Sequence, residues 1–119
     1  MKVKTSELTG MRLDWAVKTC ENRTLHGIGL ITLVKGGVWC DWENQRFSTD
    51  WAKAGPIIER EKINLSNGTT DRHGHIWCAW IHDVTVKDPI GPTPLIAAMR
   101  AYVASKLGDE VEIPEELKA

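Results

Sequence analysis

The chain has 119 residues, a length typical of one domain built around one hydrophobic core. Its 15 basic and 16 acidic side chains leave a formal net charge of -1, so no overall field attracts it to nucleic acid or to an anionic membrane. General nucleic-acid binding is therefore disfavoured. Since no apolar run approaches the roughly 18 residues that a membrane span requires, we expect a cytoplasmic protein that does not bind membranes.

Cysteine and tryptophan are the informative residue types. The three cysteines, Cys20, Cys40 and Cys78, are odd in number and far apart in the sequence, which favours reduced thiols over a disulfide framework. Tryptophan combines a large apolar face with one N–H donor, so it suits a core, an interface or a wall that stacks on a ligand. All three roles stay open for the six tryptophans, Trp15, Trp39, Trp42, Trp51, Trp77 and Trp80.

The first half of the chain predicts a helix, a pair of strands and a second helical region. Residues 8–21 place apolar side chains at helical spacing, with Thr9 as a capping residue and Asn22 as an end signal. Residues 28–42 alternate in polarity on either side of a glycine pair, which predicts two strands joined by a tight turn. A helix should begin after residues 48–50, and Pro56 predicts either a kink in it or two short helices.

The second half predicts a hairpin and a final helix. Asn67-Gly68 is a turn signal, and a strand from Ile76 that reaches about Val86 should pair with residues 62–65. The final helix has Thr93 as its cap, Pro94 at its first position and Gly108 after its last turn. Residues 109–119 should then form a loosely ordered acidic tail. These elements predict one α+β domain over residues 1–119, with a small antiparallel sheet packed against about three helices.

Several sequence blocks resemble those of a known family. They are KTSELTG at residues 4–10, LDWAV at 13–17, STDW at 48–51, GPIIERE at 55–61, GPTPLIAAMR at 91–100 and YVASKLGDEV at 102–111. The chain resembles the NinX-like accessory proteins of lambdoid phages and prophages, a family of unknown function. The resemblance implies an α-β-α sandwich in the cytoplasm of a bacterial host, and it implies no known reaction.

The histidines and cysteines could suggest a metal site or a nucleophile. His73, His75 and Cys78, with His82 beyond, include good zinc ligands, but the first two fall in a predicted loop and no further ligand follows at a recurring spacing. Each cysteine lies in an apolar pattern that predicts a buried thiol, not an activated thiolate. Since no phosphate-loop, dinucleotide or serine-nucleophile motif occurs either, we expect no metal, no cofactor and no enzymatic activity.

Two helix starts rich in hydroxyl groups are the best candidate site. The free N–H groups and the positive end of a helix favour hydrogen-bond acceptors and anions. If the two starts meet, Trp51 could stack on a ring, the threonines could bind phosphate or ribose, and Arg60 or Arg100 could add positive charge. Ordinary capping is the alternative, and Asp50 disfavours an anion beside it. The candidate ligand-binding residues are Ser48, Thr49, Asp50, Trp51, Gly91, Pro92, Thr93 and Arg100.

Two functions remain open from the sequence. The first is a non-catalytic accessory protein that binds a small nucleotide-like or anionic ligand and modulates host defence, for example by sequestering a signalling molecule. The second is a protein-interaction module in which exposed tryptophans form a homo-oligomer or bind a host protein. An enzyme or a metal-binding protein is the remaining alternative.

Overall fold

The computed structural model describes residues 1–26, 46–70, 74–82, 90–114 and 117. Along the chain the elements are β1 (Lys2–Lys4), the 3-10 helix η1 (Thr5–Glu7), α1 (Gly10–His26), α2 (Trp51–Glu61), β2 (Ile63–Thr70), β3 (Gly74–Ile81), β4 (Ile90–Gly91), α3 (Pro94–Leu107) and β5 (Glu110–Glu112). Within these residues, three α-helices and two small antiparallel sheets confirm the predicted α+β class. The two strands predicted between residues 28 and 42 fall outside the described residues.

Helix α1 begins later and ends later than predicted. Leu8 still has extended backbone angles, and the first intrahelical carbonyl is that of Thr9, which accepts from the Leu13 N–H. The prediction that Asn22 ends the helix is wrong, because α1 continues to His26. Asparagine costs a helix only about 0.5–0.7 kcal/mol relative to alanine, which is too little to end a helix that tertiary packing stabilises.

Helix α2 is continuous from Trp51 to Glu61, so the alternative of two short helices is wrong. Pro56 lies within it and has no N–H to donate to the carbonyl of Ala52. Both residues are exposed, so water can hydrogen-bond to that carbonyl. The helix ends at Glu61, and the next residue, Lys62, has a left-handed backbone with φ at 55°. The Lys62 N–H donates to the carbonyls of Ile58 and Glu59.

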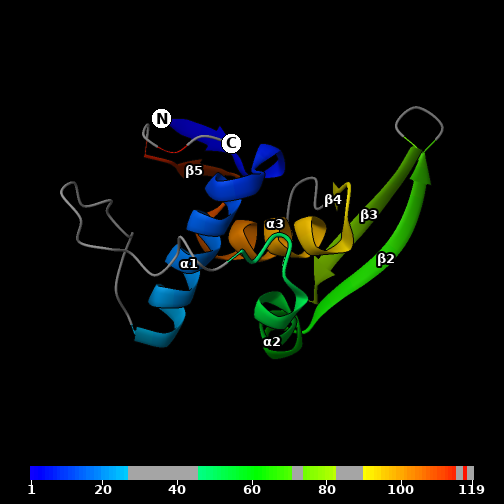
Figure 1. Ribbon diagram of the computed structural model, residues 1–119, viewed down its shortest axis with the longest axis horizontal. Helices are drawn as coiled ribbons and strands as arrows, with labels where there is room; N and C mark the ends of the chain where they lie inside the picture. The colour runs from blue at the N-terminus through cyan, green and yellow to red at the C-terminus, as the bar shows by residue number, and fades with distance from the viewer. Residues whose placement is uncertain (27–45, 71–73, 83–89, 115–116, 118–119) are drawn as a thin grey trace.

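Helix α3 has the predicted cap and the predicted end. The Thr93 side chain accepts from the N–H of Ile96, Pro94 is the first helical residue, and Gly108 follows with φ at 92°. Its residues are buried almost all round, and three fully buried alanines permit close approach of its neighbours. Accordingly α3 occupies the middle of the fold, between α1 on one side and strands β2, β3 and β4 on the other (Figure 1).

The predicted hairpin is present but longer than expected. Strand β2 pairs antiparallel with β3 from Ile63 opposite Ile81 to Thr70 opposite Gly74. Asn67-Gly68 therefore lies within β2, and the prediction of a turn there is wrong because eight pairs with β3 outweigh a weak local preference. Strand β3 ends at Ile81, and the predicted continuation to about Val86 falls outside the described residues.

The C-terminal segment differs from the loosely ordered tail that its acidic composition predicts. Strand β5 pairs antiparallel with β1, with Val111 opposite Val3, so the two ends of the chain lie side by side (Figure 1). Val111, Ile113 and Leu117 are all buried. The alternation of glutamate with an apolar residue at 110–113 is the period-two pattern of a half-buried strand, which explains the order.

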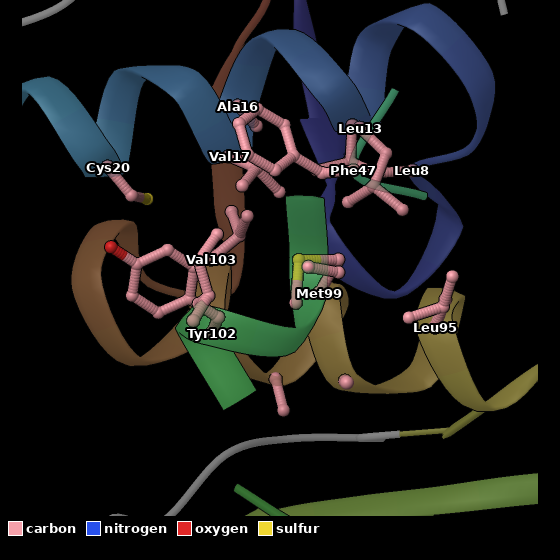
Figure 2. Packing of buried hydrophobic residues seen from close by; sticks show 14 of the residues in the cluster. Leu8, Leu13, Ala16, Val17, Cys20, Phe47, Leu95, Met99, Tyr102 and Val103 are labelled. Carbon is pink, nitrogen blue, oxygen red and sulfur yellow. The ribbon is translucent and has the colours of Figure 1, made fainter. Parts of the chain in front are cut away.

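The core is formed where α1 faces α3. Figure 2 shows Leu13, Ala16 and Val17 of α1 on one side and Met99 and Val103 of α3 on the other. Phe47, from the segment that precedes α2, also belongs to this cluster.

The thiol of Cys20 is buried in the core, and that of Cys78 is half-buried on β3. None of the helices in the described residues combines the length and the apolar character needed to cross a membrane.

Candidate functional site

The start of α2 is built by an aspartate cap. Asp50 has extended backbone angles, and its carboxylate accepts from the N–H of Ala52 at 2.9 Å. Its carbonyl accepts from the N–H groups of Lys53 and Ala54. Asp50 therefore caps the start of α2, and its carboxylate places a negative charge beside the first turn of the helix.

A carboxylate from α1 holds the segment in front of this cap. The Asp14 Oδ1 accepts from the Ser48 N–H at 2.9 Å, and both residues are buried. Burial raises the pKa of Asp14, while the hydrogen bonds from Ser48 and the charge of Arg46 act in the opposite direction. Ser48 is thus a buried anchor, whereas Thr49, the next residue, is exposed.

The start of α3 is positioned by Gly91 and Arg100. A Cβ atom at Gly91 would lie 2.7 Å from the Ala97 nitrogen, so only glycine permits this approach of β4 to the first turn of α3. The Arg100 Nη1 donates to the Ile90 carbonyl at 3.0 Å, and its Nε donates to the Leu8 carbonyl at 2.9 Å. Arg100 is buried, which lowers its pKa, and its guanidinium holds the backbone that leads to Thr93.

The two helix starts meet at one open pocket of about 240 Å³. The indole of Trp51 is 54% exposed and forms one wall. Of the eight candidate residues, three line the pocket, while Asp50 and Pro92 lie next to lining residues in the chain. Ser48, Gly91 and Arg100 do not line it and support the backbone instead. The lining residues are Thr49, Trp51, Thr93, Pro94 and Leu95.

Two backbone N–H groups remain available at this pocket. In the first turn of α3, Pro94 has no N–H, and the amides of Ile96 and Ala97 donate to the side chain and the carbonyl of Thr93. In α2 the amides after Trp51 donate to Asp50. Within the described residues, the amides of Trp51 and Leu95 have no acceptor, and both belong to residues that line the pocket.

Arg60 lies in a different cluster at the far end of α2. Its guanidinium donates to both carboxylate oxygens of Glu21 on α1 and to the hydroxyl of Tyr102 on α3. The Tyr102 hydroxyl donates to the same carboxylate at 2.7 Å. The neighbouring Glu61 carboxylate accepts from Arg60 and forms an ion pair with Lys106. Burial, the largest single influence, would raise the pKa of Glu61, but the combined effect of the two cations is larger and lowers it. Arg60 is therefore a link between three helices.

The predicted histidine and cysteine positions do not converge in the described part of the chain. His73 lies outside it, and the backbone of His75 belongs to β3 instead of a loop. Cys78 is half-buried on β3 and His82 is exposed just after it. Among the residues that the structure describes, no group of three or more His, Cys, Asp or Glu side chains is arranged to hold a metal ion.

The candidate residues predicted from the sequence omit two residues that line the pocket and one that supports it. Pro94 and Leu95 line the pocket, but their local signals indicate only a helix start and an apolar stripe. Asp14 carries no local signal for its contact with Ser48, because the two residues are 34 positions apart. All three roles depend on how segments far apart in sequence are packed.

Comparison with known proteins identifies the family. The family model described as "Bacteriophage P22, NinX" matches residues 4–106, which cover both helix starts and the whole of α1, α2 and β2–β4. No curated protein matched the chain. The match spans most of the chain, and the protein belongs to the bacteriophage P22 NinX family.

Proposed function

We propose that this protein is a non-catalytic phage accessory protein that binds a small nucleotide-like molecule between the starts of α2 and α3. The observation that carries the proposal is the open pocket with the exposed Trp51 ring as one wall. An indole more than half exposed beside a pocket has a free face, and stacking of a base on such a face gains about 1–3 kcal/mol. Sequestering such a molecule from the host, and so modulating host defence, requires no chemistry.

The residues around the pocket support binding over catalysis. The five lining residues provide hydroxyl groups, a ring and apolar surface, and none of them is an acid or a base in the physiological pH range. Thr93 has its side-chain oxygen engaged by the Ile96 N–H at 3.1 Å, and its hydroxyl hydrogen can still be donated to a ligand. Thr49 is exposed beside it.

Titration with a panel of nucleosides and nucleotides tests this function. Binding is followed by calorimetry and by the melting temperature. Trp51→Ala should weaken binding at least about fivefold, since base stacking on an aromatic ring contributes about 1–3 kcal/mol, and Trp51→Phe should recover part of the affinity. Trp80→Ala is the matched control, because Trp80 is 45% exposed, lies on β3 and is not among the residues that line the pocket.

Two outcomes would contradict the proposed function. One is a panel in which no compound binds to the wild-type protein. The other is a ligand whose affinity is unchanged by Trp51→Ala but reduced by Trp80→Ala, which would move the site to the sheet.

Self-association through the β2–β3–β4 sheet is the second candidate function. Trp80 and Ile90 are 45% and 38% exposed. Ile90 pairs with Cys78, two residues from Trp80, so the three side chains share one face. A hairpin of two eight-residue strands measures about 27 Å by 10 Å, which is an area of roughly 270 Å². This area is well below the roughly 800 Å² that each partner of a stable interface buries. Weak self-association is therefore expected, and sedimentation over a range of concentrations with wild type and Trp80→Ser would detect it.

A further inference from the structure

The charges that the two helix starts themselves contribute nearly cancel. The N-terminus of a helix carries about half a positive elementary charge, and both α2 and α3 begin with pocket residues. Asp50 contributes one full negative charge between the lining residues Thr49 and Trp51. Two half charges against one carboxylate sum to about zero. A phosphate group entering the pocket therefore gains no net attraction to offset the loss of its hydration.

Arg60 and Arg100, the two arginines that the sequence suggests as sources of positive charge, are engaged elsewhere. Arginine is the side chain best suited to a phosphate because its N–H groups form paired hydrogen bonds. Arg100 donates to the Leu8 and Ile90 carbonyls, and Arg60 is bound to Glu21 and Tyr102. None of the five lining residues is a lysine or an arginine. The pocket thus lacks a cationic partner for a phosphate in its lining.

The lining is instead rich in neutral hydrogen-bond donors. The N–H groups of Trp51 and Leu95 have no acceptor within the described residues, and the hydroxyl groups of Thr49 and Thr93 stand beside them. A flat heterocycle with carbonyl oxygens and ring nitrogens offers acceptors to such groups while its face stacks on the Trp51 indole.

From these features we infer that the pocket recognises the ring of a nucleoside and disfavours its phosphorylated forms, with Asp50 as the residue that sets this preference. The inference rests on the proposed function, because it concerns the same pocket and the same Trp51 wall. It narrows the ligand class from nucleotide-like or anionic molecules to neutral, acceptor-rich rings that carry little or no phosphate.

The experiment compares each nucleoside with its 5′-monophosphate and 5′-triphosphate by calorimetry at low ionic strength, where charge effects are least screened. Wild type should bind the nucleoside more tightly than either phosphorylated form. Asp50→Asn removes the charge and keeps a good helix cap, and it should shift the nucleoside-to-monophosphate affinity ratio about tenfold toward the monophosphate. Glu59→Gln, an equal change of charge at an exposed site of α2 away from the lining, should leave the ratio unchanged.

The possible failures are distinguishable. If the phosphorylated compounds bind wild type as tightly as the nucleoside, or if Asp50→Asn and Glu59→Gln have the same effect, the charge preference is overturned and the proposed function stands. If no compound of the series binds at all, the proposed function and the inference fall together. Circular dichroism and melting curves of the two variants confirm that both remain folded.

Discussion

Asp14 shows how one buried side chain determines the position of a helix start. It lies on α1, and its carboxylate accepts from the N–H of Ser48, two residues before the Asp50 cap. Both partners are buried, so neither can exchange this hydrogen bond for one with bulk water. The placement of Thr49 and Trp51 in the pocket depends on this contact.

Replacement of Asp14 should separate the role of its oxygen from that of its charge. Asp14→Ala leaves the buried Ser48 N–H without an acceptor and should lower the free energy of unfolding by about 1–3 kcal/mol. Asp14→Asn retains an oxygen acceptor and should lower the free energy of unfolding by clearly less than Asp14→Ala does. Urea unfolding of both variants measures the difference. An asparagine variant as unstable as the alanine variant would show that the charge, not the acceptor, holds the segment.

The pH dependence of stability provides a second readout of the same pair. Burial raises the pKa of Asp14 above its ordinary value of 3.8, so the folded state binds this proton more tightly than the unfolded chain. The contribution of Asp14 to stability is therefore fully present below pH 3.8 and is lost as the pH rises through the raised value. In Asp14→Asn this part of the pH dependence should disappear.

At the scale of elements, α2 is held at both of its ends by polar contacts with other helices. Asp14 of α1 anchors the segment before it, and Arg60 in its last turn binds Glu21 of α1 and Tyr102 of α3. Only Ala54 and Ile57 of α2 are buried. Ile58 also packs against the core, and the two polar contacts add to this modest apolar packing in orienting α2.

Removal of the Arg60 guanidinium should therefore destabilise the protein more than its partial exposure suggests. Arg60→Met keeps the apolar stem and leaves the largely buried Glu21 carboxylate without its cation, at an expected cost of about 1–3 kcal/mol. Lys53→Met removes an equal charge from an exposed position of α2 and should change stability by less than about 0.5 kcal/mol. Equal losses in the two variants, measured by urea unfolding, would show that the Arg60 cluster does not stabilise α2.

The elements also show what can be predicted from local sequence. Helix α3 could be predicted closely, because Thr93, Pro94 and Gly108 are strong start and stop signals. The extent of β2 could not, since Asn67-Gly68 favours a turn locally and is overridden by pairing with β3. Strand β5 was missed because its glutamates dominate the composition, although Val111 and Ile113 alternate with them and are buried.

At the scale of the whole molecule, contacts between distant segments assemble the candidate site. The pocket lies between residues 49–51 and residues 93–95. Asp14 of α1 supports the first segment through its hydrogen bond with Ser48. Arg100 supports the second segment by donating to the carbonyls of both Leu8 and Ile90. The sequence could nominate Thr49, Trp51 and Thr93 because capping residues, and the first residues that follow them, have local signatures. It could not show that Arg100 is buried and bound to backbone, because that depends on the packing of α3 between its neighbours.

If the two helix starts form one ligand pocket, a nuclear magnetic resonance titration of nitrogen-labelled protein with a nucleoside should detect it directly. The largest shifts should occur at the backbone amides of Trp51 and Leu95 and at the Trp51 indole N–H, and the Trp80 indole N–H should not shift. Shifts centred on Trp80 and Ile90, or no shifts at saturating nucleoside, would contradict it.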